Sequence, residues 1–194
     1  MKRARWWHSL ATLLAAAPLQ SSECRGMVFP EHVQVAGTSL TLNGLGVRKA
    51  TIFKVNVYVA ALYVVSPTHD PHAILDSAGP SELALQFVRG VSANELRERW
   101  SEGFAKNAKG NASGGLPALE ERIATLNAWM TDIQSGQRMT FVHVPGKGIT
   151  VDVNGALKGA IPGDDFARVF LSIWLGDDPP NPELKSGVLG GTCD

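Results

Sequence analysis

Residues 42–65 read LNGLGVRKATIFKVNVYVAALYVV. Two glycines, Gly44 and Gly46, precede one arginine, and a long run of β-branched and aromatic residues follows it. The pattern predicts a turn and then a single central strand from Arg48 to Val65, buried on at least one face. A fixed cation at the mouth of such a strand can meet an anionic group that sits over the sheet. We therefore expect a ligand pocket that contains Arg48.

The remaining pattern predicts strands, then helices, then a hairpin, then helices. Ser92 with Glu95 three residues later is typical of a capped helix start, and apolar side chains at helical spacing follow it. Because strands and helices are segregated, we expect an α+β fold with an antiparallel sheet. Besides the central strand, we expect a hairpin at 33–42 that turns at Ala36-Gly37, and strands at 81–88, 138–145 and 148–153. One helix is expected to begin at Ser92, and others to cover 117–134, 164–175 and 182–189.

The chain has the size of one domain and an apolar leader. Its 194 residues, 44% of them hydrophobic, can build one sizeable core. Lys2, Arg3 and Arg5 precede a short apolar stretch, residues 6–19, which is typical of a secretory signal peptide. The stretch is shorter than the roughly 20 apolar residues of a membrane-spanning helix, and an uncleaved anchor is the alternative.

We expect the signal peptide to cover residues 1–22 and the folded domain to cover 23–194, with cleavage between Ala17 and Cys24. The protein would then be periplasmic or secreted, with no stable membrane span after cleavage. Removal of the leader leaves 15 of the 18 basic residues against 18 acidic ones. No cluster of Lys and Arg remains, so we expect no nucleic-acid partner.

The two cysteines, Cys24 and Cys193, lie near the two ends of the expected domain. Export implies an oxidising compartment, and domain termini are often close together, so the pair is a candidate for a disulfide. No nucleophile motif, phosphate-binding loop or dinucleotide fingerprint is present, and no metal site is expected. Gly44-Leu-Gly46 is interpreted as a turn.

Two blocks of sequence carry a family resemblance. Residues 43–63 and residues 162–190, the second reading PGDDFARVFLSIWLGDDPPNPELKSGVLG, resemble the chalcone isomerase-like family, and the similarity extends over 33–190. Within the family, the chain resembles exported bacterial members, in keeping with the expected signal peptide. The resemblance implies an open-faced β-sandwich, in which a helical layer covers a large antiparallel sheet and a ligand cleft lies between them.

The resemblance also implies a role for the arginine. In plant chalcone isomerases the guanidinium holds a phenolate during an intramolecular ring closure, while a tyrosine-bound water polarises the ketone. In fatty-acid-binding members the same arginine holds a carboxylate, and Arg48 matches its position. A charge-assisted hydrogen bond in a water-poor cleft underlies both uses.

The other catalytic positions of the family are not matched. Phe53 occupies the position of the isomerases' strand threonine, and Leu96 occupies the position of their helix tyrosine. Arg99 stands at the lysine, Gly103 at the asparagine and Ile173 at the late threonine. Without the tyrosine hydroxyl, the donor that polarises the electrophile is missing, so chalcone cyclisation is not expected.

Our first hypothesis is a non-catalytic binder of a small amphiphilic ligand. Arg48 would hold the carboxylate of a fatty acid, and Phe53, Tyr58 and Leu96 would line the apolar part. Trp100 and Phe104 are interpreted as core residues. Haem is a possible alternative ligand, in which case His143 is the axial-ligand candidate.

The second hypothesis is an isomerase or intramolecular lyase that acts on an unidentified substrate. Arg48 would stabilise an anion, and Lys54, Tyr58 or Arg99 would relay a proton. Tyr58 would then have a pKa lowered by the neighbouring cation. The third hypothesis is a structural or interaction protein with a filled core.

Overall fold

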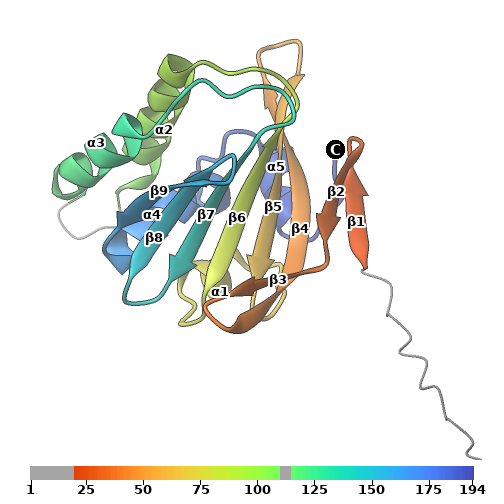
Figure 1. Cartoon of the computed structure of the whole chain (residues 1–194), viewed down its shortest axis with the longest axis horizontal. Helices are drawn as coiled ribbons and strands as arrows, with labels where there is room; N and C mark the ends of the chain where they lie inside the picture. Colours follow the sequence, from red (N-terminus) through yellow and green to blue (C-terminus); the bar gives the residue numbers. More distant parts are fainter. Residues whose placement is uncertain (1–19, 110–114) are drawn as a thin grey trace, which may run out of the picture.

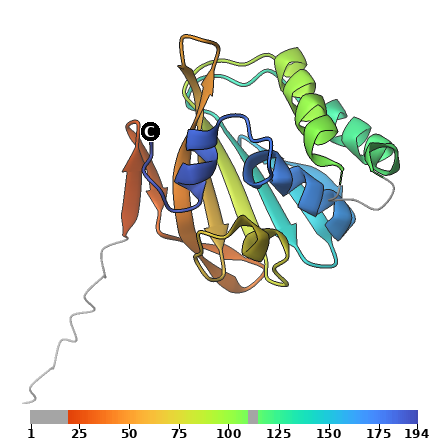
Figure 2. The same cartoon turned by 180° about the vertical axis from the view of Figure 1, so that it is seen from behind.

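The structure is a computed structural model that describes residues 20–109 and 115–194. Seven antiparallel strands form one sheet in the order β3-β4-β5-β6-β7-β8-β9, and the helices lie on one side of it (Figure 1; Figure 2). The elements are β1 Ser21–Cys24, β2 Met27–Pro30, β3 His32–Val35, β4 Thr38–Ala50, β5 Val55–Val64, α1 Pro71–Leu75, β6 Ser81–Phe87, α2 Ala93–Asn107, η1 Leu116–Leu119, α3 Glu120–Ala128, β7 Arg138–Val144, β8 Gly148–Val153, β9 Ala156–Ile161, α4 Asp164–Leu175 and α5 Pro182–Val188. The expected α+β class is confirmed.

Strand β5 is buried on both faces. Tyr58, Ala60 and Leu62 belong to the main core under the helices. Val59 and Tyr63, which alternate with them, belong to a second apolar cluster on the opposite face, closed in part by the β1–β2 hairpin. Successive side chains of a strand point to opposite faces, so apolar residues at consecutive positions put β5 in the middle of the molecule.

The single strand expected from Arg48 to Val65 is wrong. Strand β4 continues through Arg48 to Ala50, a turn follows at residues 51–54, and β5 begins at Val55. Thr51 and Lys54 take positive φ angles of 63° and 52°, and the Lys54 N–H donates to the Thr51 carbonyl at 3.1 Å. The turn contains no glycine or proline, the residues that usually mark a turn in a sequence.

Gly44 and Gly46 lie inside β4 and not in a turn, so that interpretation is also wrong. Both face helix α5. A Cβ atom at Gly44 would overlap the Gly187 carbonyl oxygen, and one at Gly46 would overlap the Leu184 carbonyl oxygen. The glycines therefore let the backbone of α5 lie directly against the strand.

Two further elements differ from the expectation. Strand β9, which was not expected, follows β8 through a two-residue turn at Asn154 and Gly155, whose φ angles of 53° and 80° suit the Asn-Gly sequence. Helix α3 ends at Ala128 and not at Gln134, because the chain then extends to form a bridge between Ile133 and Val91.

A disulfide joins Cys24 on β1 to Cys193, with the two Cα atoms 6.0 Å apart. The expected signal peptide lies outside the described residues up to residue 19, and β1 begins at Ser21, before the expected domain start at 23. Across the described ranges, no helix is both long and apolar enough to cross a membrane.

The contact between α5 and β4 predicts a large effect of one methyl group. We expect Gly46→Ala to lower the free energy of unfolding by about 1–3 kcal/mol, because the new Cβ meets backbone that cannot turn aside. Gly90→Ala is the control, since its Cβ would find only ordinary contacts, 3.6 Å or more away. Urea denaturation measures both variants, and equal stability of Gly46→Ala and the wild type would contradict the packing argument.

Candidate functional site

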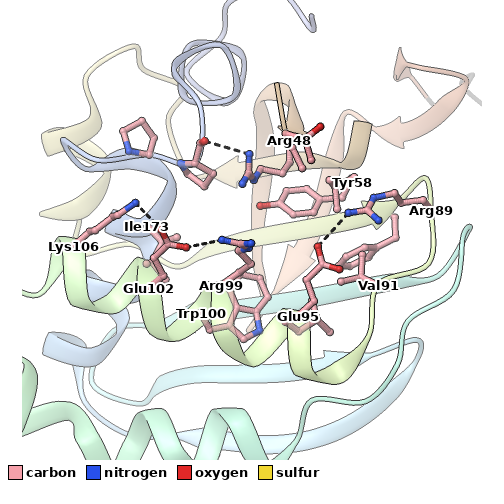
Figure 3. Close-up of a pocket in the computed structure, with 18 of the residues that line it drawn as sticks. Arg48, Tyr58, Arg89, Val91, Glu95, Arg99, Trp100, Glu102, Lys106 and Ile173 are labelled. Carbon is pink, nitrogen blue, oxygen red and sulfur yellow. Dashed lines mark hydrogen bonds and ion pairs between the residues drawn. The ribbon is translucent and has the colours of Figure 1, made fainter. Parts of the chain in front are cut away.

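A cavity of about 430 Å³ opens where β4 ends and β5 begins, against helix α2 and the loop after α4 (Figure 3). Its size is in the range of small-molecule sites. The apolar part of its wall comes from β5, β6, α2, α4 and the segment before α2. These side chains are Val57, Phe87, Val91, Leu96, Trp100 and Ile173.

A β-bulge shapes the wall beside Arg48. Arg48 lies opposite Tyr58, whereas Lys49 lies opposite Asn56, so Val57 is an extra residue on β5. Val57 and Tyr58 consequently both face the helical layer, and both line the cavity. Bulges are frequent next to functional sites because they re-aim a side chain.

The guanidinium of Arg48 is half-buried and is held by backbone carbonyls. Its Nη1 donates to the Pro180 oxygen at 3.2 Å and to the Lys49 oxygen. Of the ion pairs between described residues, none includes Arg48. The structure therefore places a cation at the cavity without a carboxylate partner in the described part of the chain.

Two hydrogen bonds made by the side chain of Asn181 hold the loop that carries Pro180 against β4. Its Oδ1 accepts from the Lys49 N–H at 3.1 Å, and its Nδ2 donates to the Val47 oxygen at 3.2 Å. Sequence reasoning missed both Pro180 and Asn181. The available clue was the segment DDPPN at residues 177–181, which belongs to the second family-like block.

Three other cations line the cavity, and each has an acidic partner. Arg89 meets Glu95 at 3.2 Å, and Glu102 accepts from both Arg99 and Lys106 at 2.8 Å (Figure 3). The hydrogen bonds from Lys106 and then Arg99 hold the pKa of Glu102 below its ordinary value. Two carboxylates thus face these three cations, so most of their positive charge is compensated within the protein.

Tyr58 is buried behind Arg48, and its hydroxyl oxygen accepts a hydrogen bond from the Trp174 Nε1 at 3.0 Å. Burial raises the pKa of Tyr58 to about 12, and the opposing effects of Arg48 and the Trp174 hydrogen bond are smaller. The expectation that the cation lowers the pKa of Tyr58 is wrong, because loss of hydration disfavours the phenolate more than the cation favours it.

The expected site residues separate into two groups. Tyr58, Leu96 and Arg99 line the cavity with Arg48, as do Gly103 and Ile173 at the other family positions. Phe53 does not: it lies in the turn between β4 and β5, its side chain is 81% exposed, and its interpretation as a pocket residue is wrong.

Of three other candidates, Lys54 and Phe104 lie outside the cavity wall and Trp100 belongs to it. Lys54 lies in the same turn as Phe53 and faces Glu183 at 3.9 Å. Phe104 is fully buried, as expected of a core residue. Trp100, interpreted as core, is buried and also forms part of the wall.

His143 does not fit the role of axial ligand to a haem held by Arg48. It lies on β7 opposite Ser81, and Ser81 lies opposite Val64, six residues along β5 from Tyr58. That separation is roughly 20 Å of strand. The His143 Nε2 instead meets Asp164 Oδ1 at 3.3 Å. Among residues 20–109 and 115–194, no cluster of His, Cys, Asp and Glu could hold a metal ion.

Comparisons with known proteins identify the family and the fold. The sequence matches the model of a family described as chalcone isomerase-like over residues 21–190. The fold is similar to the crystal structure of a fatty-acid binding protein of Arabidopsis thaliana, with a TM-score of 0.71 and 16% identity, covering 88% of this chain and 96% of that chain. At this identity the likeness concerns the fold. A search among curated proteins finds no match.

The burial of the chain's two tyrosines predicts a late alkaline titration. Burial raises the pKa of both Tyr58, to about 12, and Tyr63. The neutral phenols therefore stabilise the fold below pH ~10, the ordinary tyrosine pKa, and this stabilisation is lost as the pH rises toward 12. We expect phenolate absorbance to stay near zero at pH 10 and then to rise together with unfolding. A tyrosine that is half-ionised at pH 10 in the folded protein would contradict this.

Proposed function

Because the chain belongs to the chalcone isomerase-like family, we propose that it is a non-catalytic binder of a small amphiphilic carboxylate. A fatty acid is the ligand class that fits best. The proposal depends on one observation above all: Arg48 is a half-buried cation at a partly apolar cavity, with no acidic partner among the described residues.

The geometry of Arg48 leaves donors for a ligand. Both of its hydrogen bonds to the protein use Nη1. In the described structure Nε and Nη2 therefore remain available, and a guanidinium can bind a carboxylate through two parallel N–H donors. The carboxylate would neutralise the charge of Arg48, and the hydrocarbon chain would lie along Leu96, Trp100 and Ile173.

Two further observations support binding over catalysis. The fold resembles that of a protein named for fatty-acid binding. Helix α2 carries Leu96 and Arg99 on its cavity side and no tyrosine. The hydroxyl that polarises the electrophile in the family's isomerases therefore has no counterpart on this helix.

An intramolecular lyase is the second candidate, and Tyr58 is the observation that favours it. Its hydroxyl oxygen accepts from Trp174, and its pKa near 12 keeps the hydroxyl protonated at neutral pH. A neutral phenol next to Arg48 can donate to a substrate carbonyl. This alternative predicts turnover of a bound substrate, whereas the binder releases its ligand unchanged.

We also propose that the protein is exported to the bacterial periplasm. The basic and apolar leader in residues 1–19 and the Cys24–Cys193 disulfide are both compatible with an oxidising compartment. In fractionated bacterial cells, we expect the protein in the periplasmic extract, with an intact mass that lacks the leader. Retention of the whole leader in the cytoplasmic fraction would contradict export.

Replacing Arg48, the residue that we propose to anchor the carboxylate, is the direct test of binding. We expect Arg48→Ala to weaken fatty-acid binding by about 1.5–3 kcal/mol, the net value of hydrogen bonds to a charged group, or roughly 10- to 150-fold. Arg99→Ala is the matched control in the same cavity. Since Glu102 already compensates Arg99, its loss should change affinity less than threefold, as a rough bound for an exposed pair. Titration calorimetry measures both.

Equal losses in the two variants would refute the assignment of Arg48 as the anchor, provided that both unfold at the wild-type temperature. An empty wild-type protein that takes up no carboxylate of any chain length would refute the binding function itself.

The length of the apolar part can be measured with a series of saturated fatty acids. Each CH₂ group that enters the cavity should add about 0.8 kcal/mol to the binding free energy, because that is the value of burying one methylene. We expect the increments to stop where the chain outgrows a cavity of about 430 Å³. Affinity that is independent of chain length would place the hydrocarbon outside the cavity.

A further inference from the structure

The turn between β4 and β5 exposes two large apolar side chains. Ile52 is 89% exposed and Phe53 is 81% exposed, and Val55 beside them is 45% exposed. The hairpin projects past the ends of the neighbouring strands (Figure 1; Figure 2). The other exposed large apolar residues in the described structure, Val28, Val65 and Leu157, do not adjoin this turn in the sequence. We call residues 51–54 the hairpin tip.

The backbone of the hairpin tip is strained. Thr51 and Lys54 both have positive φ angles, 63° and 52°. A left-handed conformation is uncommon for residues other than glycine, above all for a β-branched one, and such outliers cluster at functional sites. The Lys54 N–H donates to the Thr51 oxygen, and the Phe53 N–H donates to Thr51 Oγ1 at 3.3 Å, which closes the turn with Ile52 and Phe53 outward.

Basic residues surround the hairpin tip. Lys49 precedes it and Lys54 is its last residue. The Lys54 side chain is 71% exposed, and its nitrogen lies 3.9 Å from Glu183, its ion-pair partner among the described residues. The walls of the cavity and of the shallow depression beside it carry six basic and four acidic side chains. The whole described chain carries 15 basic and 18 acidic residues. Positive charge is therefore concentrated at this end of an otherwise mildly acidic protein.

The hairpin tip also lies at the mouth of the cavity. Ala50 and Thr51 belong to the cavity wall, next to Arg48. From this arrangement we infer that the hairpin tip docks into the surface of an anionic lipid bilayer. Ile52 and Phe53 enter the headgroup boundary while Lys49 and Lys54 contact the anionic headgroups. If the proposed function holds, the ligand passes between the bilayer and the cavity without crossing bulk water.

The charge pattern favours a lipid surface over a protein partner. A stable contact between proteins buries about 800 Å² on each side, far more than two side chains on one narrow turn can provide. An apolar pair flanked by lysines suits a surface that is apolar below and anionic above.

The test is flotation with phospholipid vesicles and no added ligand. We expect the wild type to float with vesicles of phosphatidylglycerol and phosphatidylcholine, to bind pure phosphatidylcholine at least fivefold more weakly, and to detach as salt rises. The double variant Ile52→Ser/Phe53→Ser should lose at least tenfold in partitioning. Leu157→Ser, which removes an apolar side chain that is 69% exposed on β9, should partition as the wild type does.

Three results would overturn the inference. The wild type could fail to float with anionic vesicles, or the double variant could float equally well. A wild-type dimer that becomes monomeric in the double variant would assign the hairpin tip to a second copy of the chain.

Fatty-acid binding by the double variant in solution separates this inference from the proposed function, because Ile52 and Phe53 lie outside the cavity wall. Loss of docking with intact solution binding supports the inference.

Discussion

The direct contact between the backbones of α5 and β4 is the constraint on which the site depends. Glycines at 44, 46 and 187 remove the side chains that would hold the helix away from the strand. The loop before α5 is thereby drawn over the end of β4, where Asn181 hydrogen-bonds to both neighbours of Arg48 and Pro180 accepts from its guanidinium. The packing of α5 thus sets the position of the cation.

The cations of the cavity differ in whether a carboxylate compensates their charge. Three of them are held by Glu95 or Glu102, and their attraction for an outside anion is reduced accordingly. Arg48 is held by carbonyl oxygens, which orient the guanidinium without neutralising it. In the binding function that we propose, this orientation by neutral acceptors leaves the guanidinium ready for a carboxylate, with no competing charge on it in the described structure.

Burial of Tyr58 keeps its side chain a neutral phenol. Tyr58 is next to a cation, yet its pKa rises, because its hydroxyl lies in the core against Trp174. The residue therefore acts as a neutral hydrogen-bonding group at physiological pH. In the functions that we propose, the one cavity cation without a carboxylate partner in the described structure holds an amphiphile beside the apolar part of the wall. The apolar hairpin tip at the same opening reaches the lipids that such molecules come from.

The sequence by itself determined the α+β class, the buried character of β5, the capped start of α2 at Ser92 and the presence of Arg48 at a cavity. These follow from local periodicity, capping residues and a family-like block. Tertiary structure decided that the strand breaks at residues 51–54, that Gly44 and Gly46 pack against a helix, and that Tyr58 and not Phe53 faces the cavity. It also decided that the carbonyl oxygen of Pro180 holds the guanidinium of Arg48. The turn at residues 51–54 is local, but it contains no glycine or proline to mark it in the sequence. The packing of Gly44 and Gly46 and the surroundings of Tyr58 arise from contacts between residues more than a hundred positions apart, such as Arg48 with Pro180 and Tyr58 with Trp174. Such contacts exist only after the chain has folded, so no local pattern carries them.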